Sequence, residues 1–216
     1  MAELPTDPTT RTYSGLTDAY AFFNARLFTG RLPACLITMQ RKSKTYGYFA
    51  GRRFTTRDGV EITDEIALNP SYFAERSTEA TLATLVHEMV HLEQQHFGTP
   101  SRPGYHNREW ARMMRAVGLI PTATGEPGGK QTGQQMDHCI EPGGRFARAC
   151  TELVAELGFS VPYVELWDEA EREARERKAA SKTRYTCPGC GMNAWAKPGA
   201  RLACDACHRS MEIQRR

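Results

Sequence analysis

The sequence lacks any long apolar run. No stretch of its 216 residues approaches the roughly 18 uncharged apolar residues that a membrane-spanning helix requires. Residues 1–15 also lack the basic and apolar segments of a secretion signal. These absences argue against a membrane or secreted protein, so we expect a cytoplasmic chain with no membrane partner.

The sequence also lacks a large excess of charge of either sign. Its 28 basic and 25 acidic side chains leave a net charge of +3. So small an excess gives the whole surface little attraction for nucleic acid. Four of the seven cysteines form two C-x-x-C pairs near the C-terminus, and Cys35, Cys139 and Cys150 are scattered. An odd number in this arrangement favours reduced thiols and a metal site over a disulfide scaffold.

Length and composition divide the chain into four predicted parts. The length fits one medium domain with a small module. We expect a flexible tail over residues 1–13, a main domain over 14–120, a Gly/Pro-rich insertion with a charged helical spacer over 121–183, and a cysteine-rich ribbon over 184–216.

Apolar periodicity within the main domain predicts both helices and strands. Residues 16–27 and 106–117 have helical spacing, and a longer helix is expected from Ser77 to about Phe97. Residues 34–40, 46–54 and 60–68 are rich in β-branched and aromatic side chains at hairpin spacing. We therefore predict an α+β fold in which helices pack on a small antiparallel sheet.

The long predicted helix contains the motif H-E-x-x-H, from His87 to His91. Histidines four positions apart on a helix have Cβ atoms about 5–6 Å apart and can converge on one Zn²⁺. Both fall opposite the apolar arc of the helix, so we expect them to face away from the core. Glu88 is placed to act as the general base toward water acidified by the metal.

A catalytic zinc site needs a third ligand. A metzincin would have a histidine at position 97, which is a phenylalanine here. His106 is the better candidate, because the turn-rich residues 98–104 could return the chain to the site. His138 is its competitor, in a segment whose structure and role the sequence does not predict. Three histidine ligands leave the fourth position open for water or substrate, which predicts hydrolysis.

The C-terminal cysteines have the spacing of a second zinc site. Two C-x-x-C pairs separated by 13 residues predict a structural Cys₄ site formed by Cys187, Cys190, Cys204 and Cys207. The chain would thus hold two Zn²⁺ ions, one catalytic and one structural, and no nucleotide cofactor is expected.

The same tail, residues 184–216, has a net charge of +4. Cationic and aromatic side chains together are typical of single-strand binding. The candidate DNA contacts are Tyr185, Trp195, Lys197, Arg201 and Arg209. The alternative, that Trp195 packs over the zinc knuckles and the arginines are merely solvated, has equal weight.

Several motifs, taken in order, resemble the SprT-like metalloproteases, which include the Spartan DNA–protein crosslink proteases. They are ALNP (residues 67–70), HEMVH, YHNREW (residues 105–110) and the ribbon segments YTCPGC, WAKPG and LACDAC. The resemblance covers about residues 14–118 and 184–210. Asn107 departs from the glycine that many members have after the third histidine.

The resemblance implies a zincin-like core with a C-terminal zinc ribbon. It implies that His87, His91 and His106 bind the catalytic zinc, with Glu88 as the base. The implied activity is hydrolysis of proteins associated with or crosslinked to DNA, as in DNA repair near the nucleoid. The expected partners are a protein substrate and DNA of single-stranded character.

No ubiquitin- or clamp-binding motif is recognisable, which favours a bacterial, phage or plasmid member. Two alternatives stay open, a non-enzymatic DNA-binding or regulatory zinc-ribbon protein and a DNA-independent metallopeptidase.

Overall fold

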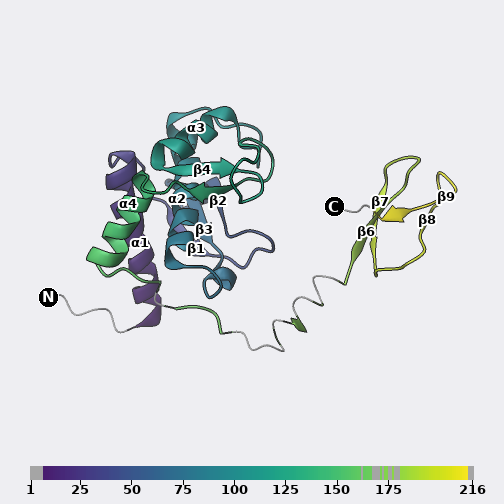
Figure 1. The fold of residues 1–216 in the computed structure, drawn as a ribbon, viewed down its shortest axis with the longest axis horizontal. Coiled ribbons are helices and arrows are strands. Elements are labelled where there is room, and N and C mark those ends of the chain that lie inside the picture. The colour runs from purple at the N-terminus through teal and green to yellow at the C-terminus, as the bar shows by residue number, and fades with distance from the viewer. Residues whose placement is uncertain are drawn as a thin grey trace. The chain divides into compact units, whose positions relative to one another are not determined.

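The computed structural model describes residues 7–161, 163–166, 171, 173–174, 177 and 181–213 (Figure 1). The chain separates into two compact units, Met1–Glu165 and Leu166–Arg216. Both units contain small sheets, and in the first unit the four α-helices of the described residues surround a hydrophobic core. Within the described part of the chain, no helix has the length and apolar character to cross a membrane.

The first unit contains four α-helices and five strands within its described residues. The helices are α1 (Pro8–Phe28), α2 (Thr78–Phe97), α3 (Arg108–Val117) and α4 (Arg145–Thr151), with a 3-10 turn at Pro70–Tyr72 and a π-helical turn at Glu152–Glu156. The strands are β1 (Leu36–Met39), β2 (Gly47–Thr55), β3 (Ile62–Leu68), β4 (Leu119–Thr122) and β5 (Asp137–Ile140). This confirms the mixed α+β class.

Helix α1 begins earlier than the sequence suggests. The side chain of Asp7 accepts hydrogen bonds from the N–H groups of Thr9 and Thr10, at 3.1 and 2.9 Å, and Pro8 occupies the first turn. Such a cap satisfies N–H groups that have no partner within the helix. The predicted flexible tail is therefore wrong over residues 8–13, while residues 1–6 lie outside the described residues.

The main sheet has the strand order β1-β3-β2. Strands β2 and β3 form an antiparallel pair, as predicted, but β1 pairs with β3 in parallel. The prediction of an antiparallel sheet is wrong for β1. Hairpin spacing fixes the direction of consecutive strands only, whereas β1 pairs with the more distant β3 in the same direction.

The predicted helix of residues 77–97 is confirmed as α2, which lies between α1 and α3 in the first unit (Figure 1). Ser77 caps it by accepting from the N–H of Ala80 at 3.1 Å. Both faces of its middle are buried, including His87. We predicted that His87 and His91 face away from the core. This prediction is wrong, because α3 and β5 cover the face of α2 that carries them.

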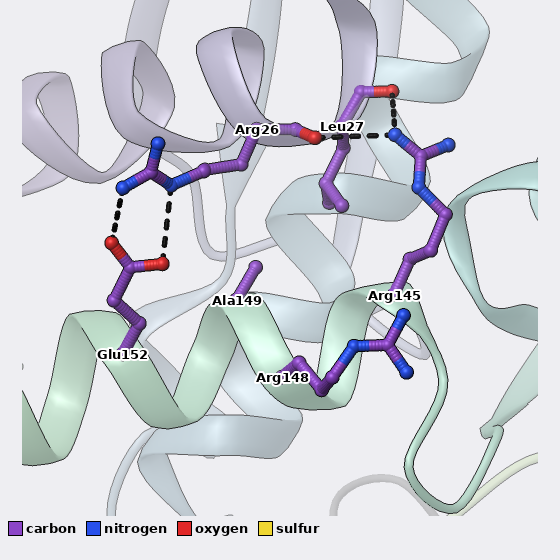
Figure 2. Close-up of a pocket in the computed structure, with 6 residues that line it drawn as sticks. All are labelled: Arg26, Leu27, Arg145, Arg148, Ala149 and Glu152. Carbon is purple, nitrogen blue, oxygen red and sulfur yellow. Dashed lines mark hydrogen bonds and ion pairs between the residues drawn. The ribbon is translucent and has the colours of Figure 1, made fainter.

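Part of the predicted insertion belongs to the first unit. Strands β4 and β5 form an antiparallel pair, and α4 places Phe146 against Phe23 with ring centroids 5.6 Å apart. Arg145 donates to the main-chain oxygen of Arg26 at 3.1 Å, and Arg26 forms an ion pair with Glu152 (Figure 2). These contacts fasten α4 to the end of α1, so the boundary predicted at residue 120 is wrong.

The second unit contains β6 (Thr183–Thr186), β7 (Asn193–Ala196), β8 (Ala203–Cys204), β9 (Arg209–Ser210) and β10 (Glu212–Ile213). The strands form a three-stranded sheet of order β10-β6-β7 and a two-stranded β8-β9 pair. Most of the charged helix predicted over residues 165–180 lies outside the described residues, but residues 171, 173, 174 and 177 are helical, and Arg177 forms an ion pair with Glu173 at 3.0 Å.

Candidate metal centres

Three histidines, two from one helix and one from a later segment, lie close together in the first unit. Helix α2 supplies His87 and His91, and His106 stands just before α3. One ring nitrogen of each lies within 4.8 Å of the others. The ring centroids of His87 and His91 are 5.3 Å apart, and those of His91 and His106 are 4.8 Å apart. The structure thus brings together the three predicted ligands, and His138 is outside this cluster.

Two local features place His106. Its main chain pairs with that of Gly133, with N–H to oxygen distances of 2.8 and 3.0 Å in the two directions. Asn107 caps α3 by accepting from the N–H of Trp110 at 2.9 Å, and it also accepts from Gln94 of α2. Position 107, where the sequence departs from the family pattern, therefore links α3 to the helix that holds the other two histidines.

The indole ring of Trp110 packs against all three histidines of the cluster. It is fully buried, with ring centroids 4.3 Å from His106, 5.3 Å from His91 and 5.1 Å from His87. The sequence analysis includes Trp110 only in the YHNREW segment and the predicted helix of residues 106–117, and it missed this role. The available signal was its position in the first turn of α3, four residues after His106.

Burial keeps these imidazoles neutral. It lowers the pKa of His91 to about 3 and that of His87 well below 6.5, and it also lowers the pKa of His106. A metal ligand must offer an unprotonated nitrogen, so the rings are ready to coordinate at neutral pH. Three imidazole donors with a fourth position free suit Zn²⁺.

Glu88 lies buried on α2 beside the first ligand. Burial raises its pKa to about 8, against the opposing effects of Lys42 and of a hydrogen bond from the main chain of Phe49. A Cβ at Gly47 of β2 would lie 3.4 Å from the Cγ of Glu88, so the glycine allows β2 to approach closely. A cation at the histidines would lower the pKa of Glu88 and favour the carboxylate that a general base needs.

The second unit gathers its four sulfur atoms in the same way. Donors from Cys187, Cys190, Cys204 and Cys207 lie within 4.8 Å of one another, and all seven cysteines of the chain, each in a described range, are free thiols. The N–H of Cys190 lowers the pKa of Cys187 to about 7, while a hydrogen bond with Cys190 raises that of Cys207 to about 12. Four crowded thiols suit a thiophilic cation such as Zn²⁺.

The candidate DNA contacts of this unit differ in exposure. Trp195 is 63% exposed, and the side chains of Lys197, Arg201 and Arg209 are also exposed. The prediction for Tyr185 is wrong as a stacking residue, because the ring is 2% exposed and its hydroxyl donates to the main-chain oxygen of Lys197 at 3.0 Å.

Strand alternation explains this difference, since Tyr185 points inward and its neighbour Arg184 outward. Arg184 faces Trp195 across the β6–β7 pair, a juxtaposition that the sequence did not reveal.

Comparison with known proteins assigns the first unit to a family. The SprT-like family model matches residues 16–127, slightly more than half of the chain. The chain belongs to the SprT-like family. The match contains all three histidines and Glu88 and ends before the cysteine cluster.

Membership of the SprT-like family indicates a metalloprotease-type function. A Salmonella typhimurium protein described as an uncharacterized protein in the mucB 3′ region is 51% identical over 59 residues. That stretch is 27% of this SprT-like chain and 80% of the Salmonella protein, which supports a bacterial member.

Proposed function

We propose that this SprT-like protein has a zincin-like core and is a zinc-dependent endopeptidase that cleaves proteins associated with or crosslinked to DNA. The observation that supports this most strongly is the cluster of three neutral histidines, with ligand atoms within 4.8 Å, beside buried Glu88. In the proposed arrangement His87, His91 and His106 hold the catalytic zinc, and the four cysteines hold a structural zinc.

Zinc bound by the histidines would supply a Lewis acid for water and for the scissile carbonyl. Glu88 would accept a proton from the attacking water and deliver it to the leaving amine. Strand β2 lies at an edge of the sheet, and its Gly47 adjoins Glu88. An extended polypeptide could pair with such an edge, which would present a peptide bond to the base.

Two exposed surfaces support DNA as the partner. On α3, Arg108, Arg112 and Arg115 are exposed at positions i, i+4 and i+7, so they form one stripe along the helix. None of the three forms an ion pair within the described residues. In the second unit, Arg184 faces exposed Trp195, which places a cation beside a stacking ring. Single-stranded DNA is the expected ligand because its bases are free to stack.

The test is proteolysis of a DNA-binding protein by the full zinc-loaded chain, with single-stranded DNA, with duplex DNA, and without DNA. Glu88→Gln should lower the rate by about 10²- to 10⁴-fold, as expected for loss of a general base. Glu79→Gln is the matched control, since Glu79 is exposed in the first turn of the same helix. Trp195→Ala should weaken single-strand binding by about 5- to 150-fold, corresponding to about 1–3 kcal/mol per stacked base.

Each outcome selects one function. Cleavage that needs both Glu88 and DNA supports the proposal. Cleavage that needs Glu88 but ignores DNA would leave a general metallopeptidase. Tight DNA binding without cleavage, in a chain that holds its zinc, would instead support a non-enzymatic DNA-binding protein.

A further inference from the structure

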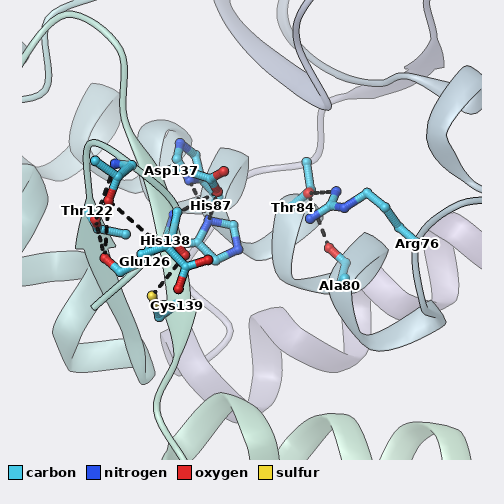
Figure 3. A network of polar contacts seen from close by, with 11 residues as sticks. Arg76, Ala80, Thr84, His87, Thr122, Glu126, Asp137, His138 and Cys139 are labelled. Atoms are coloured by element: carbon cyan, nitrogen blue, oxygen red, sulfur yellow. Dashed lines mark hydrogen bonds and ion pairs between the residues drawn. The ribbon is translucent and has the colours of Figure 1, made fainter. Parts of the chain in front are cut away.

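The β4–β5 region, which comprises the two strands and the residues between them, contacts two of the three histidines. The main-chain oxygen of Gly133 lies 3.2 Å from Nδ1 of His106. Nδ1 of His138, on β5, lies 3.0 Å from Nδ1 of His87 (Figure 3). Each of these two rings thus has its Nδ1 engaged by the same region, which leaves Nε2 as the nitrogen available to a metal.

The contact between His87 and His138 admits two arrangements of protons. If His87 donates from Nδ1, its Nε2 carries a free lone pair and can coordinate a metal. If His138 donates instead, a neutral His87 carries its proton on Nε2 and cannot coordinate through that atom. His87 can therefore bind a metal through Nε2 only when Nδ1 of His138 accepts the hydrogen bond.

Metal binding itself selects the first arrangement, because a cation on Nε2 of His87 takes the place of any proton there and leaves the ring proton on Nδ1. A carboxylate oxygen of Asp137 accepts from the main-chain N–H of His138 at 2.8 Å and lies 3.6 Å from its Nδ1. The charge of Asp137 favours a proton on Nδ1 of His138 in the metal-free protein, and it stabilises the positive charge that the pair gains when His87 binds a cation. For His106, the carbonyl oxygen of Gly133 can only accept, so the two rings would be held in the same tautomer.

The acceptor is also held in place. The side chain of His138 is 5% exposed, and its ring centroid is 5.2 Å from that of His87. The next residue, Cys139, donates to the main-chain oxygen of Gly125 at 3.2 Å (Figure 3). A buried, anchored ring loses little freedom when it accepts a hydrogen bond, so it can fix the orientation of its partner.

We propose that His138 is a positioning residue that accepts the Nδ1–H of His87 and so presents Nε2 of His87 to the catalytic metal. This inference rests on the proposed zinc site. It gives His138 a different role from the one considered in the sequence, where it competed with His106 as a third ligand.

The test is zinc affinity of the full chain, measured by competition with a chromophoric chelator. His138→Leu fills similar space without an acceptor and should lose about 10- to 100-fold in affinity at the histidine site, whereas His138→Asn should lose less than about threefold. Asparagine should preserve the zinc affinity because its side-chain oxygen would occupy nearly the position of the histidine Nδ1 and can accept the same hydrogen bond. The cysteine site serves as an internal control, since its affinity should not change.

Equal zinc affinity in wild type and His138→Leu would overturn this inference alone, and so would equal losses in both variants. A wild-type chain that binds no zinc at its histidines would overturn the proposed zinc site as well. If the leucine variant does not fold, nitrogen NMR of the zinc-loaded wild type decides the question. A protonated Nδ1 on His87 supports the inference, and an unprotonated one refutes it.

Discussion

Replacing Glu88 with glutamine should stabilise the metal-free protein, and the gain should grow as the pH rises. Burial raises the pKa of Glu88 from 4.5 to about 8, so the folded protein retains a proton that the unfolded chain releases. The stability contributed by protonated Glu88 is therefore complete below about pH 4.5 and is lost as the pH rises toward 8. At about 1.4 kcal/mol per pH unit, the loss is about 2 kcal/mol at pH 6 and about 4 kcal/mol at pH 8. Glutamine has no such proton to release.

Urea unfolding of both proteins in the presence of a metal chelator measures this effect. The quantity of interest is the difference in unfolding free energy between wild type and Glu88→Gln at pH 6 and at pH 8. Titration of the buried histidines contributes to both proteins, so it largely cancels in this difference. Glu79→Gln is the control, because an exposed side chain should show little change with pH.

Zinc should reduce the difference between the two proteins. A cation near Glu88 favours the carboxylate, which returns the pKa of Glu88 toward its ordinary value. A difference that stays constant between pH 6 and pH 8 in the metal-free protein would refute the reasoning, because it would mean that Glu88 ionises as freely in the folded protein as in the unfolded chain.

Three further substitutions test the architecture. Gly47→Ala would place a Cβ 2.8 Å from the main-chain oxygen of Ala67 on β3 and 2.9 Å from Cγ2 of Thr84 on α2, so a loss of about 1–3 kcal/mol in unfolding free energy is expected, and unchanged stability would contradict the close approach of β2 to α2. Asn107→Ala removes the cap of α3 and should cost about 1 kcal/mol in urea unfolding, whereas Asn107→Asp should retain most of the stability. Cys204→Ser should reduce bound zinc, measured by atomic absorption, by about one ion per chain, and loss of zinc from the histidines as well would contradict separate sites.

The sequence alone determined the features that depend on local spacing. His87 and His91 are four residues apart, and the capping residue Ser77 marks the start of the helix that holds them. Two C-x-x-C pairs likewise specify their own cluster, because each pair can form a turn around a metal without help from distant segments. Helix periodicity, capping and ligand spacing all act within a few residues, so they can be read without the fold.

Only the tertiary structure decided the features that join distant segments. Strand β1 pairs in parallel with β3, a long-range choice that hairpin spacing does not encode. His106 is held in the cluster by a main-chain pair with Gly133, 27 residues away, while His138 meets His87 across 51 residues. Such contacts depend on how loops close and which surfaces pack. The sequence therefore determined which side chains could bind metal, and the fold decided which of them meet and which nitrogen each one presents.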